Sequence, residues 1–356
     1  MPTAQTTPRD IAPILEPILK KSKLPAIAGG VLVGDKVAGL GAVGVRKFGD
    51  PTPVTAEDKF HIGSCTKMMT ATLAAILVEE GMLKWDSTIG DVIGDRIGTI
   101  HPDFEPVTLE QLLAHVGGLR KSPPRKLWRE AWENQGELKP SEQRMVFVSA
   151  LLARKPGYRP GGKMVYSNQG YSVVGVMLET VAGASWEDLL KERIFVPLDM
   201  SSAGFRAPMG KGEIDQPWGH SGKKPVSPVS VESDNPDAIG PAGAVHLSME
   251  DLLKFARFYL RREPGALLKK EESFEKLNST LPNSRAQGVG GWLVHDIKTF
   301  GGHCLQMIGS NTVWFTIFWI FPGFDMAIVV SANSAPFSAF FTCDKAVADL
   351  LEEFKP

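Results

Sequence analysis

The chain has 356 residues, of which 43% are hydrophobic, and it contains 36 glycines and 26 prolines. Such a composition is typical of a globular protein with a sizeable core. The 39 basic and 40 acidic residues leave a formal net charge of −1, so no excess of charge favours a nucleic-acid or anionic-lipid surface. We therefore expect neither nucleic acid nor a membrane as partner, and a substrate that is not recognised by bulk charge.

The cysteines and histidines do not form the pattern of a metal site. Cys65, Cys304 and Cys343 are odd in number and far apart, unlike the paired cysteines of a disulfide scaffold or a zinc site. None of the seven histidines belongs to a His-Glu-x-x-His sequence, which would supply a convergent ligand set. We therefore expect no metal and no other cofactor.

The first residues and the longest apolar run bear on where the protein resides. Residues 1–10 are polar and lack the apolar stretch of a signal peptide. If Met1 is the native start, we expect a cytoplasmic protein; an exported form from which a signal has been removed is the alternative. The apolar run 313–321 is about half of the ~20 residues that a membrane-spanning helix needs, and it indicates a buried strand.

The first 88 residues predict a helix, a β-hairpin and a second helix, at 11–21, 26–45 and 66–80. The hairpin has apolar strands on either side of Gly34-Asp35-Lys36, a composition that favours a tight turn. The second helix has apolar side chains at helical spacing and is followed by Gly81, a residue that favours a helix end.

The remaining residues predict a helical region followed by a return of strands. Residues 89–242 have helical stretches joined by loops rich in proline and glycine, and the segment 207–241 is interpreted as a long surface loop. Strand patterns return after Gly288 and end in a helix. The predicted helices are 109–115, 142–153, 170–181 and 339–354, and the predicted strands are 289–296, 304–308, 313–321 and 326–332.

These elements predict an α/β fold of the α+β type. Residues 1–88 and 243–356 are expected to form an antiparallel sheet flanked by helices. Residues 89–242 are expected to form a mainly helical region. The active site is expected at the junction of the two regions.

Ser64 and Lys67 are the first candidates for catalysis. A serine hydroxyl needs a base within hydrogen-bond reach before it can attack a carbonyl. Ser64 and Lys67 are three positions apart at the start of a predicted helix, so both lie on one face, and the helix N-terminus favours developing negative charge. Burial would keep the lysine amine neutral enough to accept a proton. Taken alone, the same pattern also fits an N-cap serine followed by an exposed lysine.

Two longer segments favour the catalytic interpretation. Residues 60–70, Phe-His-Ile-Gly-Ser-Cys-Thr-Lys-Met-Met-Thr, and Tyr166-Ser167-Asn168 resemble the active-site helix and the Tyr-x-Asn element of serine β-lactamases and penicillin-binding proteins. Within this superfamily the chain most closely resembles the family VIII carboxylesterases, which are similar to class C β-lactamases. The resemblance implies that Ser64 is the nucleophile, that Lys67 and Tyr166 move protons, and that Asn168 orients the lysine or the substrate. Two other similar segments are interpreted as framework: 112–119 with His115, and 240–246 with His246.

The third element of this family, Lys-Thr-Gly or His-x-Gly on a strand that borders the cleft, is matched only in part. The best match is His303-Cys304-Leu305, where Leu305 replaces the glycine. Because side chains alternate along a strand, Leu305 is expected to narrow the cleft beside His303. By the family's spacing, the backbone N–H of Gln306 would join that of Ser64 in an oxyanion hole. The segment 298–301, Lys-Thr-Phe-Gly, is a weaker match because it has one residue too many before its glycine.

This departure shapes the function that the resemblance implies. An imidazole is mostly neutral where the family has a permanently charged lysine, so recognition of a substrate carboxylate is weakened. We therefore expect a carboxylesterase that cleaves a small neutral ester through an acyl-enzyme on Ser64. The alternatives are a β-lactamase or D-amino-acid peptidase, and a penicillin-binding sensor domain without turnover. The natural ester and the oligomeric state are left open.

Overall fold

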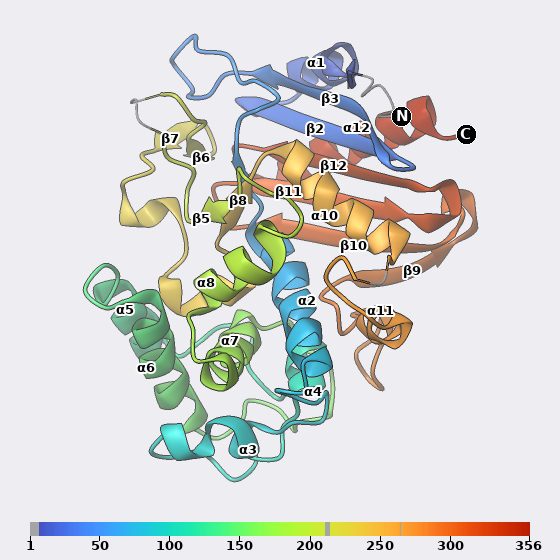
Figure 1. The fold of residues 1–356 in the computed structure, drawn as a ribbon. Helices are drawn as coiled ribbons and strands as arrows, with labels where there is room; N and C mark the ends of the chain where they lie inside the picture. Colours follow the sequence, from blue (N-terminus) through green and yellow to red (C-terminus); the bar gives the residue numbers. More distant parts are fainter. Residues whose placement is uncertain (1–6, 211–213, 264) are drawn as a thin grey trace.

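A seven-stranded sheet forms the centre of the computed structural model, which describes residues 7–210, 214–263 and 265–356. The strand order is β1-β3-β2-β12-β11-β10-β9, with β1 parallel to β3 and the other neighbours antiparallel. Because β2 pairs with β12, the two ends of the chain build one sheet, as the sequence predicts (Figure 1). Its strands are β1 (Arg9–Asp10), β2 (Ala26–Val33), β3 (Lys36–Gly44), β9 (Leu293–Ile297), β10 (Gly302–Ser310), β11 (Phe315–Phe321) and β12 (Met326–Ala332). The described helices are α1 (Ala12–Lys21), α2 (Thr66–Glu79), α3 (Ile89–Ile93), α4 (Leu109–Leu113), α5 (Arg125–Glu133), α6 (Pro140–Leu152), α7 (Asn168–Ala182), α8 (Trp186–Leu190), α9 (Gly240–Gly243), α10 (Met249–Arg261), α11 (Glu271–Asn278) and α12 (Phe337–Phe354).

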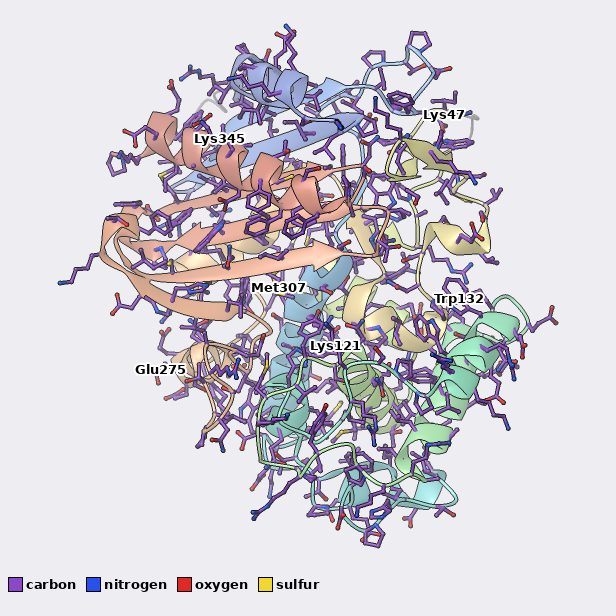
Figure 2. The ribbon with its side chains drawn as sticks, turned by 180° about the vertical axis from the view of Figure 1, so that it is seen from behind. Lys47, Lys121, Trp132, Glu275, Met307 and Lys345 are labelled. Carbon is purple, nitrogen blue, oxygen red and sulfur yellow. The ribbon has the colours of Figure 1, made fainter. Side chains whose placement is uncertain are left out.

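Helices cover both faces of this sheet, because its central strands are apolar on both sides. All residues of β11 and β12 are buried, and side chains that alternate along a strand point to opposite faces. Ile328 and Val330 pack with α1 and α12 on one face, whereas Ala327 and Val329 pack with α10 on the other. Figures 1 and 2 show the molecule from opposite sides, with α10 in front of the sheet in the first view.

Helix α2 connects the sheet with the helical part of the molecule. Its residues 66–77 are all buried, as expected for a helix that is surrounded by protein and apolar on nearly every side. Its N-terminal end lies against β10 through the short turn η1 (Gly63–Cys65), and it contacts α7, α8, α9 and α11. Figure 1 shows α2 running from the sheet into the group formed by α3, α4 and α7.

The smaller strands of the described residues form two further sheets. The smaller strands are β4 (Phe60–His61), β5 (Gly204–Phe205), β6 (Gly219–Ser221), β7 (Lys224–Val226) and β8 (Val245–Leu247).

The predicted long helices and strands are present within a few residues, but the segment 207–241 differs from the predicted surface loop. It contains the hairpin β6–β7, and its residues 236–241 are buried. Burial of this backbone is possible because its polar groups have partners: Gln143 accepts the Ala238 N–H, and Arg144 donates to the Asp237 carbonyl. Among the described residues, no helix is both long and apolar enough to span a membrane. The division of the chain at 88 and 243 stays a prediction.

Candidate active site

Ser64 lies in a tight turn at the N-terminal end of α2. Gly63 has φ +50°, a left-handed conformation that glycine adopts without strain, and it brings the chain against the end of β10. Ser64 is partly exposed, whereas Lys67, one helical turn later, is fully buried. The Lys67 Nζ lies 3.1 Å from the Ser64 Oγ. The structure thus brings together the two residues that the sequence proposed as nucleophile and base.

The surroundings of Lys67 favour a neutral amine. Its Nζ lies 2.8 Å from the Asn168 Oδ1 and 2.8 Å from the Ala242 carbonyl oxygen. Both oxygens are acceptors, so they engage two N–H groups and leave the remaining position of the nitrogen to Ser64. Burial lowers the pKa of Lys67 well below its usual range, because desolvation penalises the ammonium. A neutral Nζ presents its lone pair to the Ser64 hydroxyl proton.

Tyr166 is the second proton-carrying group beside the nucleophile. It lies two residues before Asn168, which begins α7, and its hydroxyl donates a hydrogen bond of 2.7 Å to the Ser64 Oγ. Burial raises the pKa of Tyr166, so the phenol keeps its proton. When Lys67 is neutral, the Ser64 oxygen receives a hydrogen bond from Tyr166 and directs its own proton to the Lys67 Nζ.

The third element does not lie where the sequence placed it. His303, Leu305 and Gln306 are in the first part of β10, where they pair with β9. Residues advance about 3.3 Å along a strand, so Gln306 lies about 13 Å from Ser310 and His303 about 23 Å from it. Ser310 is the residue of β10 that meets the Ser64 turn, since a Cβ on Gly63 would lie 2.4 Å from the Ser310 nitrogen. The predicted roles of His303, Leu305 and Gln306 at the site are therefore wrong.

The last four residues of β10, Met307 to Ser310, occupy the place of the third element. A Cβ on Gly309 would lie 2.0 Å from the Ile62 carbonyl oxygen and 2.9 Å from the Cys65 nitrogen, so the close approach requires glycine. β9 pairs with β10 only as far as Gln306, which leaves the edge of these four residues free of β9. Met307 packs in the core between the sheet and α2 (Figure 2). The element Met-Ile-Gly-Ser thus keeps the glycine and carries no charged side chain.

Comparison with known proteins agrees with this geometry. The model of the beta-lactamase family matches residues 11–352. The chain belongs to this family. It is 25% identical over 321 residues to penicillin-binding protein 4 of Amycolatopsis lactamdurans, across 85% of this chain and 79% of the relative. Membership places the chain among the serine hydrolases of the β-lactamase and penicillin-binding-protein superfamily, as the sequence indicates.

Two solved structures share the fold of this family member. One is the octameric penicillin-binding protein homologue from Pyrococcus abyssi, with 24% identity, a TM-score of 0.75, and coverage of 96% of this chain and 77% of that one. The other is SurE solved with D-Leu, with 21% identity, a TM-score of 0.74, and coverage of 97% of this chain and 75% of that one. The mixed α/β fold with a mostly antiparallel sheet is therefore the fold of the family.

His115, in one of the two segments interpreted as framework, supports Tyr166. The two rings lie 4.5 Å apart between centroids, and the His115 Nδ1 accepts the Ser167 N–H at 3.2 Å. Burial, together with the nearby Lys67, lowers the pKa of His115 to about 3. The imidazole is therefore neutral near pH 7 and is not a proton carrier in that range, which agrees with a framework role.

The Ala242 carbonyl is a functional group that the sequence analysis missed. It accepts a hydrogen bond from Lys67, and its neighbour Pro241 accepts one of 2.7 Å from Thr70 of α2. Thr70 in turn accepts a hydrogen bond of 3.1 Å from the Trp186 indole. The segment 240–246 does resemble its family counterpart, but a backbone carbonyl has no signature in residue type.

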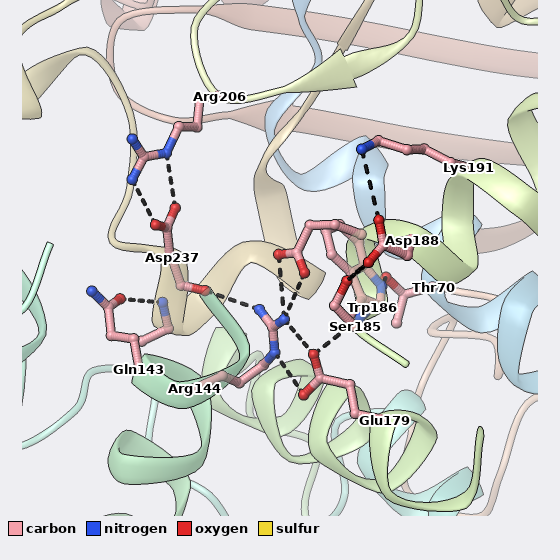
Figure 3. Close-up of polar contacts among 12 residues, drawn as sticks. Thr70, Gln143, Arg144, Glu179, Ser185, Trp186, Asp188, Lys191, Arg206 and Asp237 are labelled. Carbon is pink, nitrogen blue, oxygen red and sulfur yellow. Dashed lines mark hydrogen bonds and ion pairs between the residues drawn. The ribbon is translucent and has the colours of Figure 1, made fainter. Parts of the chain in front are cut away.

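A buried ion network, drawn in Figure 3, contacts the segment that carries the Ala242 carbonyl. Arg144 of α6 is fully buried, and its Nη2 lies 2.6 Å from Glu179 of α7 and 3.0 Å from Glu187 of α8. Its Nη1 donates to the Asp237 carbonyl at 3.0 Å. A Cβ on Gly240 would lie 3.3 Å from the same nitrogen. Arg144 therefore ties three helices to the segment that carries the Ala242 carbonyl.

Proposed function

We propose that this member of the beta-lactamase family is a carboxylesterase that cleaves neutral esters through an acyl-enzyme on Ser64. The observation that carries the proposal is a complete Ser64–Lys67–Tyr166 set beside a third element without charge. A substrate carboxylate, as on a β-lactam or a peptide C-terminus, is held best by a cationic side chain. Met307 supplies no cation. The proposed preference for neutral esters therefore follows from the uncharged third element and not from crowding by Leu305.

The proposed acylation begins with proton transfer from the Ser64 Oγ to the neutral Lys67 Nζ, which becomes an ammonium. The oxygen forms a bond to the ester carbonyl carbon, and the carbonyl oxygen becomes an oxyanion. When the C–O bond to the alcohol breaks, the leaving oxygen takes a proton from the Tyr166 hydroxyl. The Lys67 ammonium then returns its proton to the tyrosine oxygen, so that charge balances at the end of the step.

The oxyanion would be held by two backbone amides, of Ser64 and of Ser310. Ser64 lies in η1, directly before the N-terminal end of α2, where N–H groups and the helix dipole favour negative charge. Ser310 replaces Gln306 in this role because the end of β10 meets the Ser64 turn. For deacylation, Lys67 accepts a proton from a water molecule that attacks the acyl carbon. When the bond between that carbon and the Ser64 Oγ breaks, the Lys67 ammonium returns the proton to the Ser64 oxygen and the carboxylic acid is released.

A β-lactamase or D-amino-acid peptidase is the second candidate, and a penicillin-binding sensor without turnover is the third. The second is favoured by the similarity to a penicillin-binding protein of Amycolatopsis lactamdurans and by the similarity to SurE, whose structure was solved with D-Leu. Both candidates would use Ser64 as the acylated residue. They differ from an esterase in the substrate that acylates Ser64 and in the rate at which the acyl group is released.

The test compares ester hydrolysis by the wild type and by Ser64→Ala. Turnover of a short-chain p-nitrophenyl ester should fall by about 10³-fold or more, because the acyl-enzyme cannot form. Ser221→Ala is the matched control, because the chain has another Ser-x-x-Lys sequence at residues 221–224, Ser-Gly-Lys-Lys. Ser221 is exposed and lies in β6, so its substitution should keep the wild-type rate. An unchanged rate in Ser64→Ala would remove Ser64 as nucleophile.

The same preparations separate the three candidates when nitrocefin, a D-alanyl-D-alanine peptide and penicillin are added. An esterase should hydrolyse the nitrophenyl ester with the highest kcat/KM. Faster turnover of nitrocefin or of the peptide would replace the esterase assignment by the second candidate. A penicillin adduct that persists in the intact mass spectrum, without turnover of any substrate, would point to the sensor.

A further inference from the structure

A buried cluster outside the Ser64–Lys67–Tyr166 set ties together the two backbone segments that meet at Ser64. Its members are His61 in β4, Asp234 just after the turn η4 (Val231–Ser233), and Asn311 just after β10. These side chains belong to residues that are 0%, 8% and 5% exposed. Polar groups that are buried this fully are retained only with partners, so their hydrogen bonds define a fixed geometry.

His61 holds the residue directly before the nucleophile. Its Nδ1 accepts the Gly63 N–H at 3.0 Å. Because a backbone amide nitrogen can only donate, Nδ1 carries no proton in this arrangement. The ring proton is then on Nε2, which lies 3.0 Å from the Asp234 Oδ2 and donates to it. One tautomer of His61 thus connects Gly63 to the carboxylate.

Asn311 connects the other oxygen of the same carboxylate to the end of β10. The Asp234 Oδ1 accepts from the Asn311 Nδ2 at 3.1 Å and from the Asn235 N–H at 2.7 Å. The Asn311 Oδ1 accepts the Trp314 N–H at 3.1 Å, which fixes the turn after the strand. Asp234 therefore reaches both segments, each through one side chain.

We propose that His61, Asp234 and Asn311 form a clamp that sets the separation of the Ser64 and Ser310 backbone N–H groups and so shapes the oxyanion hole. The inference rests on the proposed acyl transfer at Ser64. A Cβ on Gly63 would lie 2.4 Å from the Ser310 nitrogen, so the segments are already in contact and a small shift of either one changes the hole. The three side chains are positioning residues, because they act through Gly63 and Ser310.

Asp234→Asn separates the clamp from ordinary packing, because it keeps the shape of the side chain and changes its hydrogen bonding. An amide has one acceptor oxygen and one donor NH₂ group. In either orientation the NH₂ group faces a donor, which is the His61 Nε2–H in one case and the Asn311 NH₂ in the other. One arm of the clamp is therefore broken whichever way the amide turns.

The measurement compares a p-nitrophenyl ester with the matching thionoester, in which sulfur replaces the carbonyl oxygen. Sulfur is a weak hydrogen-bond acceptor, so only the oxygen ester gains fully from a well-formed hole. In Asp234→Asn we expect kcat for the oxygen ester to fall about 100-fold while KM changes little. The thionoester rate should fall much less, so the ratio of the two rates should drop.

Asp251→Asn is the matched control for loss of a buried aspartate. Asp251 is 3% exposed and accepts the Ser202 N–H at 2.7 Å, at the start of α10. Its substitution should lower the melting temperature without changing the ratio of the oxygen-ester and thionoester rates. A ratio in Asp234→Asn equal to those of the wild type and Asp251→Asn would overturn the clamp.

A second variant and a second probe keep the inference testable if Asp234→Asn fails to fold or if no ester is turned over. In His61→Gln the glutamine amide still reaches Asp234, but the Gly63 N–H loses its acceptor. The same drop in the ratio of the oxygen-ester and thionoester rates is therefore expected. A fluorophosphonate, whose P=O oxygen would also occupy the hole, should label Ser64 about 100-fold more slowly in either variant. Labelling at the wild-type rate would overturn the clamp, whereas absent ester turnover with normal labelling of the wild type would overturn only the esterase proposal.

Discussion

The two walls of the active site are built from different chemistry. On the helical wall, Lys67 of α2 is held between Ser64, Asn168 and the Ala242 carbonyl. The buried ion network of Arg144 contacts the segment that carries this carbonyl. On the strand wall, the end of β10 meets the Ser64 turn through backbone contacts at Gly309 and offers the site no charge. The proposed proton-transfer groups and the proposed substrate-recognition residues therefore lie on different walls, since one wall keeps the polar set of the family while the other lacks its cation.

The largest effect is expected from Lys67→Met, which removes the base of the helical wall while nearly preserving side-chain volume. The Ser64 proton then has no acceptor, so kcat/KM for a p-nitrophenyl ester should fall about 10³- to 10⁴-fold. Steady-state kinetics with protein of confirmed fold provides the measurement. Retention of more than about a tenth of the wild-type rate would be too much for loss of a general base and would assign that role elsewhere.

The pH profile of the wild-type enzyme is the control for this variant. Only the neutral amine of Lys67 accepts a proton, so kcat/KM should be lost as pH falls and the amine becomes protonated. Because burial lowers the pKa of Lys67, the rise should be complete at a pH below the usual lysine range. The residual activity of Lys67→Met should not show this rise. A wild-type rise centred near the ordinary lysine pKa of about 10.4 would contradict the neutral amine.

The next largest effect is expected on stability, from Arg144→Met behind the helical wall. The substitution leaves Glu179 and Glu187, which Arg144 contacts at 2.6 and 3.0 Å, without their buried cation. Removing one partner of a buried ion pair costs about 3–5 kcal/mol of unfolding free energy. Denaturant unfolding measures it. Arg129→Gln is the control, because Arg129 pairs with Glu133 at 3.5 Å and both side chains are more than 60% exposed, so its loss should cost about 1 kcal/mol or less. Equal losses would contradict a special role for the buried network.

Gly309→Ala tests the strand wall with an intermediate effect on rate. The added Cβ would lie 2.0 Å from the Ile62 carbonyl oxygen, so β10 or the Ser64 turn must move. A displacement of about 1 Å at the oxyanion hole can cost about 100-fold in kcat. Gly98→Ala is the control, because Gly98, like Gly309, does not have a positive φ, and nothing lies within 4 Å of its Cβ. If Gly309→Ala kept the wild-type kcat, the end of β10 would not be part of the hole.

The same two walls differ in how far the sequence could predict them. Ser64 and Lys67 were predictable because residues three apart on a helix share a face, and Tyr166 and Asn168 because they resemble a family element. The sequence pattern predicts the third element four residues too early, because His303 is the polar residue nearest to the expected pattern. Met307 and Ile308 carry no residue-type signal, and the requirement for Gly309 appears only when η1 and β10 are seen in contact.

Contacts between residues that are far apart in the sequence explain two other features that the sequence does not predict. Arg144, Glu179 and Glu187 come from three helices, and charged residues on helices are usually solvent-exposed, so nothing in their spacing indicated a buried network. The burial of residues 236–241 depends on Gln143 and Arg144 as partners. A Pro-rich segment without those partners would indeed be a surface loop, so the prediction was wrong at residues 236–241 for a reason outside the segment.

The smallest expected effect, Met307→Lys, asks whether the missing cation of the strand wall alone decides the substrate. Met307 is 4% exposed, but it lies at the stretch of β10 that β9 does not cover, so a lysine amine could reach the open edge while its stem stays buried. A new charge-assisted hydrogen bond to a substrate carboxylate should raise kcat/KM for nitrocefin or a D-alanyl-D-alanine peptide about tenfold.

The neutral ester supplies the internal reference for this gain, and Met307→Leu is the control that changes shape without adding charge. Because Lys67, Tyr166 and Asn168 lie on the other wall, Met307→Lys should leave kcat for the p-nitrophenyl ester nearly unchanged. A parallel rise for charged and neutral substrates would mean that the substitution acts on catalysis rather than recognition. No rise for either substrate would mean that residues outside β10 select the substrate. The helical wall would then still carry out proton transfer, but the strand wall would not be the part that selects the substrate.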